Sequence, residues 1–189
     1  MIAPGAAAKI SLLRQLEGSD SQRFFFWFVF ILSGGLFWLS PHPPMVDIPQ
    51  HAGQVALFLD LLSNNPHWRD TFYINYFTPY LLGYGLWALL ATAMPIAIAL
   101  KLLLSIAFYA FVMSGMHLRR CCQADDRLDW LLIPSFFGFC FNWGFLTFLM
   151  AAPLGILFIT QAMSLDKKIN HRNLIYLFFY LKLFFQLTF

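Results

Sequence analysis

Long apolar segments without a charged residue recur along this chain and constrain its fold more than any other feature. The first, Phe24 to Ser40, is just long enough to cross a hydrocarbon core of roughly 30 Å at about 1.5 Å per helical residue. The longest runs from Leu131 to Met163 and has room for two tight crossings around the polar Asn142-Trp143-Gly144. Segments of this kind are typical of helices in a membrane.

The chain holds too many apolar side chains for a water-soluble fold of its length. Of its 189 residues, 60% are hydrophobic and 11% are charged, whereas an average soluble domain has about 25% charged residues. A soluble chain of this size would hide only about 70% of its surface, so we expect lipid to cover much of the rest. The net charge of +3 comes from short clusters between the apolar segments. Such clusters indicate anchoring at a membrane interface and not nucleic-acid binding.

We therefore predict an all-α fold, a polytopic transmembrane helical bundle over residues 24–189 that follows a cytoplasmic tail over residues 1–23. The apolar helices are expected near residues 24–40, 80–94, 95–118, 131–143, 145–163 and 173–189. Five or six of them cross, because segment 80–94 is short and could be re-entrant. The last segment stops without a cap or a flanking charge, so we expect the chain to be a truncated piece of a longer protein.

Basic residues beside the spans set the expected orientation. Residues 1–23 hold three Lys or Arg, whereas residues 41–79 hold only Arg69. The N-terminus is therefore expected in the cytoplasm and loop 41–79 outside, in a multi-pass protein of the inner (plasma) membrane. The basic loops 117–130 and 164–172 both fall inside only if the segment 80–94 does not cross.

The outer loop 41–79 contains the candidate functional residues. Its prolines rule out a regular helix before Pro49, which suits the first position of a helix. From Pro49 to Leu62, apolar residues recur at helical spacing and predict an amphipathic helix lying along the membrane surface. Asp47 lies just before this helix, and His51 lies on its apolar side.

Asp47 is the candidate catalytic base. A carboxylate held at the membrane surface could accept a proton from an attacking hydroxyl or hold a cation bound to a phosphate. The alternative is that Asp47 caps the helix at Pro49, because a carboxylate near the first turn satisfies free N–H groups and suits the helix dipole. His51 is the second candidate, although a lone histidine on a partly apolar face is more often a space-filling residue than a ligand.

Several short motifs, taken in their order along the chain, resemble one known family. They are Asp47-x-Pro49-x-His51 after a first span, Thr78-Pro79 before the next apolar helix, a helix opening at Pro95, and the run Gly138 to Phe148. This order is similar to the N-terminal half of bacterial multi-spanning glycosyltransferases of the C superfamily (GT-C type). The resemblance implies transfer of a sugar from a polyprenyl-phosphate donor at the outer face of the membrane. It assigns the base to Asp47 and a partner position to His51.

The same resemblance implies the partners of the site. The chain would bind a lipid-linked sugar within the lipid bilayer and no nucleic acid, and a divalent cation could accompany the donor phosphate. No other cofactor is evident. Because residues 1–189 hold no soluble C-terminal domain, this piece is expected to be inactive alone. The competing hypothesis is a non-catalytic membrane protein, either a transporter fragment or a helical scaffold.

The remaining candidates are interpreted as packing or surface features. Gly138 and Gly144 are expected to let helices approach closely, and Asn142 between them is expected to bond a neighbour across the turn. The 23 phenylalanines are interpreted as lipid-facing bulk. The connection 117–130 holds three arginines beside three aspartates, which predicts a solvated loop where lipid phosphate could bind. The three cysteines have no spacing for a zinc site or a disulfide framework.

Overall fold

The computed structural model describes residues 4–63, 67–76, 80–167 and 171–188, and every regular element in these ranges is helical. The elements are α1 (Pro4–Gly35), η1 (Leu36–Trp38), α2 (Ile48–Leu61), α3 (Leu81–Ala91), α4 (Ile96–Cys121), η2 (Asp126–Leu128), α5 (Asp129–Phe136), α6 (Phe139–Trp143), α7 (Leu146–Lys167) and α8 (His171–Thr188). The all-α prediction is therefore confirmed. In the described part of the chain, two helical segments are long and apolar enough to cross a membrane, Ile96–Cys121 and Leu146–Leu165.

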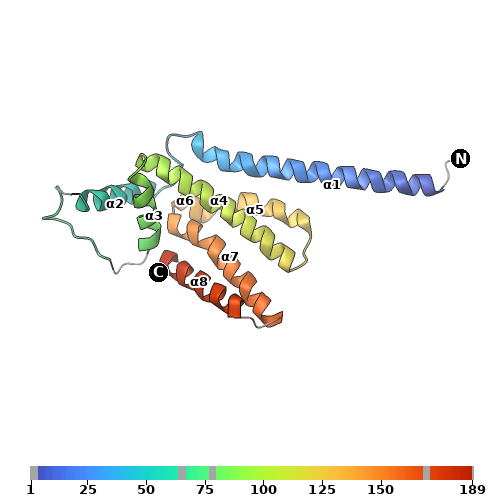
Figure 1. Ribbon diagram of the computed structural model, residues 1–189. Coiled ribbons are helices and arrows are strands. Elements are labelled where there is room, and N and C mark those ends of the chain that lie inside the picture. Colours follow the sequence, from blue (N-terminus) through green and yellow to red (C-terminus); the bar gives the residue numbers. More distant parts are fainter. Residues whose placement is uncertain (1–3, 64–66, 77–79, 168–170, 189) are drawn as a thin grey trace.

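The helix α4 is central to the molecule, and it contacts α1, α2, α3, α5 and α7. Figure 1 shows α7 and α8 as an antiparallel pair on one side of α4, with α1 on the other side. The N-terminal part of α1 extends past the other helices (Figure 1). Leu104, Phe108 and Val112 of α4 have no exposed surface, so the core surrounds the middle of this helix.

The long elements run between two ends of the molecule (Figure 1). The loop before α2, together with α2 and α3, lies at one end, and the α4–α5 connection, the end of α7 and the beginning of α8 lie at the other. The helix α3 does not run between them, because its 11 residues rise only about 16 Å at about 1.5 Å per residue. In this path the basic connection 117–130 and the end of α7 share one end of the molecule, and residues 80–94 lie at the opposite end.

The predicted tail and the first predicted span form one continuous helix. The helix α1 begins at Pro4, which suits the first position of a helix, and no proline follows before Pro41. It ends at Gly35, and the chain then turns through η1. The helical part of the predicted segment 24–40 is therefore shorter at its C-terminal end, and no break separates it from the residues before it.

The apolar segment 131–143 does not form the single helix that the sequence predicts. The helix α5 ends at Phe136, and α6 begins at Phe139. Between them Gly138 is extended, with φ −79° and ψ −152°. The helix α5 also contains Pro134, which lacks the N–H needed for a helical hydrogen bond. The chain therefore turns here and places two short helices where one was expected.

An aromatic cluster fills the core beside this turn. Its rings are Phe37, Phe108, Phe136, Phe137 and Phe141. Neighbouring ring centroids lie 5.2 to 6.2 Å apart, within the usual range for aromatic pairs. The lipid-facing interpretation suits Phe24, which is 76% exposed. It is wrong for the aromatic cluster, whose rings pack against one another.

Gly34 marks a close approach of α1 to α4. A Cβ atom at Gly34 would collide with the Tyr109 hydroxyl group, whose O–H donates a 3.0 Å hydrogen bond to the Ile31 carbonyl. Gly34→Val is therefore expected to lower the free energy of unfolding by about 1 to 3 kcal/mol, the usual cost of overpacking. Unfolding in detergent micelles measures this loss. Gly35→Val is the control, because no atom lies within 4 Å of a Cβ at Gly35; equal losses would contradict the role of the Tyr109 contact.

Candidate functional site

The backbone of Asp47 is fixed by the end of α6. The Val46 N–H donates to the Asn142 carbonyl, and the Asp47 N–H donates to the Trp143 carbonyl, each at 3.0 Å. Met45, just before them, is buried. The two residues that precede α2 are therefore held against α6, which lies far away in the sequence. This contact fixes the backbone position from which the Asp47 side chain extends.

Gly144 makes this close contact possible. Its backbone has φ +90°, in the region that favours glycine, and it ends α6 as the left-handed C-cap residue. A Cβ atom here would lie 3.0 Å from the Asp47 nitrogen and 3.3 Å from the Ile48 nitrogen. The sequence predicts a helix-packing role for Gly144 and does not reveal its contact with the Asp47 backbone. One signal is present in the sequence, because Gly144 directly follows the predicted helical segment 131–143, where a left-handed glycine often ends a helix.

Asp47 does not cap α2 with its side chain. It occupies the N-cap position, with φ −89° and ψ −4°, but its carboxylate accepts no hydrogen bond from the first turn. The capping interpretation is therefore wrong for the side chain. The first turn needs less capping than usual, because Pro49 has no N–H and the His51 N–H donates to the Asp47 carbonyl at 3.1 Å. The half-buried carboxylate is left available for other contacts.

His51 is hydrogen-bonded to Tyr84, a residue that the sequence does not mark as a candidate. The Tyr84 hydroxyl lies 2.5 Å from the His51 Nδ1, and the two ring centroids are 5.5 Å apart. Tyr84 belongs to α3, and both side chains are half-buried. The interpretation of His51 as a space-filling residue is therefore incomplete, because its imidazole has a specific hydrogen-bond partner across the α2–α3 contact.

The Asp47 carboxylate acts on Tyr84 through its charge. Burial raises the pKa of the Tyr84 hydroxyl above its ordinary value of 10.0, and the nearby Tyr80 and Asp47 side chains raise this pKa further. Tyr84 is therefore neutral at pH 7 and keeps its proton. Asp47, His51 and Tyr84 form one group of polar side chains, which we call the polar cluster.

A pocket of about 540 Å³ lies beside the polar cluster, between α2 and α3. Its walls are mostly apolar and include Val55 and Phe58 of α2, Leu81 of α3, and Ile74 from the segment before α3. Tyr84 lines the same pocket, so this residue connects the pocket with His51. The volume falls within the range of about 300 to 1,000 Å³ that is usual for small-molecule pockets.

The described residues offer little for a metal ion. No three His, Cys, Asp or Glu side chains among them gather closely enough to hold one. A cation that arrives with a phosphorylated substrate would meet a single carboxylate of the polar cluster, that of Asp47. Divalent cations such as Mg²⁺ are usually held by one or two carboxylates together with substrate phosphates and water.

The Asn142 side chain bonds residues close to it in the sequence. Its side-chain amide donates to the Gly138 carbonyl at 3.1 Å and to the Phe137 carbonyl at 3.4 Å, both in its own turn. The Asn142 side chain therefore stabilises α6 and does not join the polar cluster. Its backbone carbonyl contributes to the site, because it accepts the hydrogen bond from Val46.

Gly144→Ala tests how tightly the Asp47 loop is held. Alanine at positive φ costs about 1 to 2 kcal/mol, and the added Cβ would also push against the Asp47 nitrogen. We expect the free energy of unfolding to fall by about 2 kcal/mol, with faster hydrogen exchange at the Asp47 amide. Gly53→Ala in α2 is the control, since nothing lies within 4 Å of its Cβ and alanine favours a helix. Unchanged exchange in Gly144→Ala would contradict the proposed anchoring.

Comparison with known proteins does not identify a family for this chain. No family model, no curated protein and no solved structure matches this chain. The resemblance to C-superfamily glycosyltransferases therefore stays a prediction that rests on the short motifs around Asp47, Pro79, Pro95 and residues 138–148.

Proposed function

We propose that the chain is an integral membrane protein that binds a lipid-linked sugar phosphate, and that Asp47 accepts the proton of the acceptor hydroxyl in glycosyl transfer. The observation that carries this proposal is the position of the polar cluster beside the α2–α3 pocket. A lipid-linked sugar needs polar contacts for its head group and an apolar surface for its chain. The two features lie next to each other here.

The chemistry of such a transfer defines what the residues must do. The acceptor oxygen bonds the anomeric carbon of the sugar as its O–H bond breaks, and polyprenyl phosphate leaves with the electrons of the broken C–O bond. Asp47 would take the released proton, because its half-buried carboxylate is not used by the first turn of α2. Tyr84 keeps its proton at pH 7. When the His51 Nδ1–H donates to the Tyr84 oxygen, the Tyr84 O–H is free to donate a hydrogen bond to a phosphate oxygen. His51 would position Tyr84.

The distribution of charge supports an orientation for this site. The arginines of the α4–α5 connection lie at the end of the molecule opposite the Asp47 loop (Figure 1). Short basic loops stay in the cytoplasm, so we propose that the polar cluster faces the outside of an inner membrane. In this arrangement α1, α4, α5 with α6, α7 and α8 are the crossing passes, and α3 lies at the outer face.

A photoreactive lipid tests the proposed binding without requiring turnover. The chain, purified in detergent, is irradiated with polyprenyl phosphate that carries a diazirine in its isoprenoid chain. We expect labelled peptides from residues 54–61 of α2 and from residues 80–85 at the start of α3, because both ranges contain residues that line the pocket. A diazirine polyprenol without the phosphate should label these peptides less, because it lacks the charged head group.

A matched pair of variants separates pocket binding from general labelling. Gly85 lines the pocket and has open space around its Cβ position, so the ring of Gly85→Phe should fill part of the pocket. Gly53 does not line the pocket and also has open space around its Cβ position, so Gly53→Phe adds the same ring outside the lining. Equal labelling of both variants and the unmodified chain would reject the pocket and favour the competing hypothesis of a non-catalytic membrane protein.

A further inference from the structure

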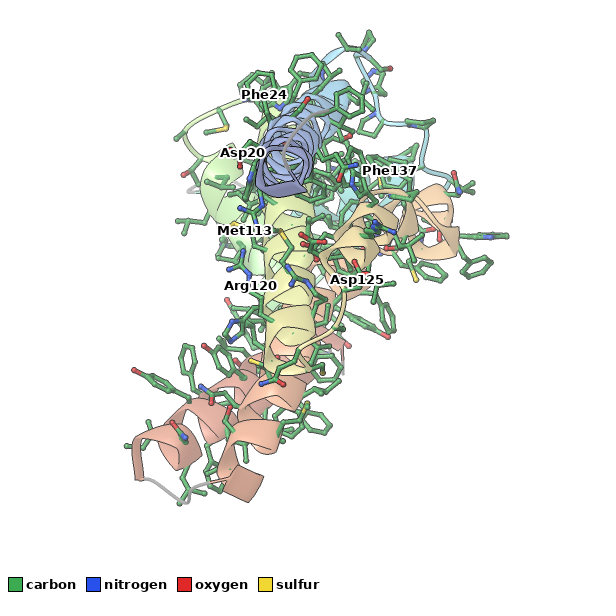
Figure 2. The ribbon with its side chains drawn as sticks, turned by 90° about the vertical axis from the view of Figure 1, so that its right-hand side faces the viewer. Asp20, Phe24, Met113, Arg120, Asp125 and Phe137 are labelled. Carbon is green, nitrogen blue, oxygen red and sulfur yellow. The ribbon has the colours of Figure 1, made fainter. Side chains whose placement is uncertain are left out.

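A second pocket, of about 460 Å³, lies at the end of the molecule opposite Asp47. It is formed by α1, the end of α4 and the beginning of α5. Its arginines are Arg23 from α1, Arg119 and Arg120 from α4, and Arg127 from η2, which directly precedes α5. We call it the arginine pocket. Figure 2 views this end of the molecule, with Asp20 on α1, Arg120 on α4 and Asp125 in the connection after α4.

Two aspartates also line the arginine pocket, but they do not neutralise it. Asp129 is buried, and each of its carboxylate oxygens accepts a hydrogen bond from the Arg119 guanidinium group, at 3.0 and 2.8 Å. Asp126 is exposed. Four arginines against two aspartates leave two positive charges in the lining. The nearby Asp125 accepts a hydrogen bond from the Arg127 backbone N–H, and its carboxylate is not part of the lining.

Three of the four guanidinium groups are free to bind a ligand. Within the ranges that the structure describes, Arg23, Arg120 and Arg127 form no ion pair with a carboxylate. Guanidinium groups bind phosphate oxygens through two parallel N–H bonds, which makes arginine the favoured residue for phosphate recognition. The Arg119–Asp129 pair, in contrast, fixes the walls of the pocket by joining α4 to the first residue of α5.

The arginine pocket lies where the apolar helices end. Arg23 directly precedes the apolar run of α1, and Arg119 directly follows the apolar run of α4. One wall of the pocket is aromatic, because Phe26 and Trp130 pack edge to face with their centroids 5.3 Å apart, and Trp27 lies beside them. Tryptophan beside arginine at the end of an apolar run is typical of the lipid head-group level.

We propose that the arginine pocket binds a phosphate group at the membrane surface, carried by the head group of an anionic phospholipid. The guanidinium groups provide the charge, and the aromatic wall provides an apolar contact for the glycerol and upper acyl chain. Basic pockets between helices at the cytoplasmic face bind phosphorylated lipid head groups in this way. This site is separate from the polar cluster and does not depend on the proposed glycosyl transfer.

Lipid titration followed by native mass spectrometry tests the proposal. The chain in dodecyl maltoside is titrated with phosphatidylglycerol and, separately, with phosphatidylcholine of the same acyl chains. We expect phosphatidylglycerol to be retained in preference. Arg120→Gln and Arg127→Gln should each weaken its binding about five-fold, which corresponds to about 1 kcal/mol per basic residue at an anionic surface. Inorganic phosphate at millimolar concentration is then added, and displacement would identify a free phosphate as the ligand, whereas retention of the lipid would identify the head group.

The control variant is Arg69→Gln, which removes the same charge from an exposed position outside the pocket. It should change binding less than two-fold. Arg120 and Arg127 are exposed and leave the Arg119–Asp129 pair intact, so both variants are expected to fold. Arg23→Gln removes an arginine that α1 contributes to the pocket, and it should also weaken the binding of phosphatidylglycerol. Equal weakening by Arg69→Gln and the pocket variants, or equal binding of the two lipids, would show nonspecific attraction and overturn the proposal.

Discussion

Asp129→Leu is expected to lower the free energy of unfolding by about 3 kcal/mol, the lower end of the range for breaking a buried ion pair. The Asp129 side chain is 8% exposed and that of Arg119 is 18% exposed. Leucine has a similar size but no acceptor, so it leaves the Arg119 guanidinium partly buried without a counter-charge. Denaturant unfolding in detergent micelles measures the change in the free energy of unfolding. We expect the loss because α4 is no longer held to α5 by this ion pair.

Two further variants make this result specific. Asp126→Leu removes an exposed carboxylate three residues earlier and should cost less than about 0.5 kcal/mol, as expected of most surface substitutions. Arg119→Met combined with Asp129→Leu should recover much of the stability, because a buried pair replaced by apolar residues of similar volume is often neutral. A loss in Asp129→Leu no larger than in Asp126→Leu would show that the pair does not hold the two helices together.

The sequence predicts the Arg119–Asp129 pair only in part. It identifies a connection of mixed charge, and the solvated interpretation suits the exposed Arg120 and Asp126. It does not reveal that Asp129 begins a helix and is buried against Arg119. Residues of opposite charge at a spacing of ten have no fixed relation until the turn between two helices is known.

The helices themselves are largely predictable, because long apolar runs and prolines mark them. The helix α2 runs from Ile48 to Leu61, one residue from the predicted start at Pro49 and one from the predicted end at Leu62. The packing of these helices is less predictable. A surface that faces lipid and a surface that faces another helix are both apolar, so the hydrophobic pattern cannot tell exposed Phe24 from buried Phe108.

Only part of the candidate site can be predicted from the sequence. Asp47 and His51 stand out because charged and titratable residues are rare beside apolar segments. Tyr84 is one of seven tyrosines, and nothing in its local sequence links it to a histidine 33 residues earlier. The contact of Gly144 with Asp47 also depends on the turn between α5 and α6, which the apolar pattern does not reveal.

Asp47→Asn is expected to separate catalysis from folding. As the base of glycosyl transfer, Asp47 needs an ionisable oxygen, so turnover should fall by about 10² or more. The free energy of unfolding should change by less than about 1 kcal/mol, because the carboxylate caps no N–H group and only its interaction with the helix dipole is lost. Sugar transfer is measured in membranes from cells that express the natural gene with or without the Asp47→Asn change. The amount of inserted protein is determined in the same membranes.

Asp60→Asn is the matched control for this prediction. Asp60 lies near the end of α2, the helix that Asp47 precedes, and its carboxylate accepts a 3.0 Å hydrogen bond from the His67 backbone N–H. Turnover should be unchanged in Asp60→Asn. If Asp47→Asn also transfers sugar at the normal rate, Asp47 is not the base. A fall in turnover with normal insertion, in Asp47→Asn alone, would instead place the proton acceptor at the one carboxylate that α2 leaves free at its start.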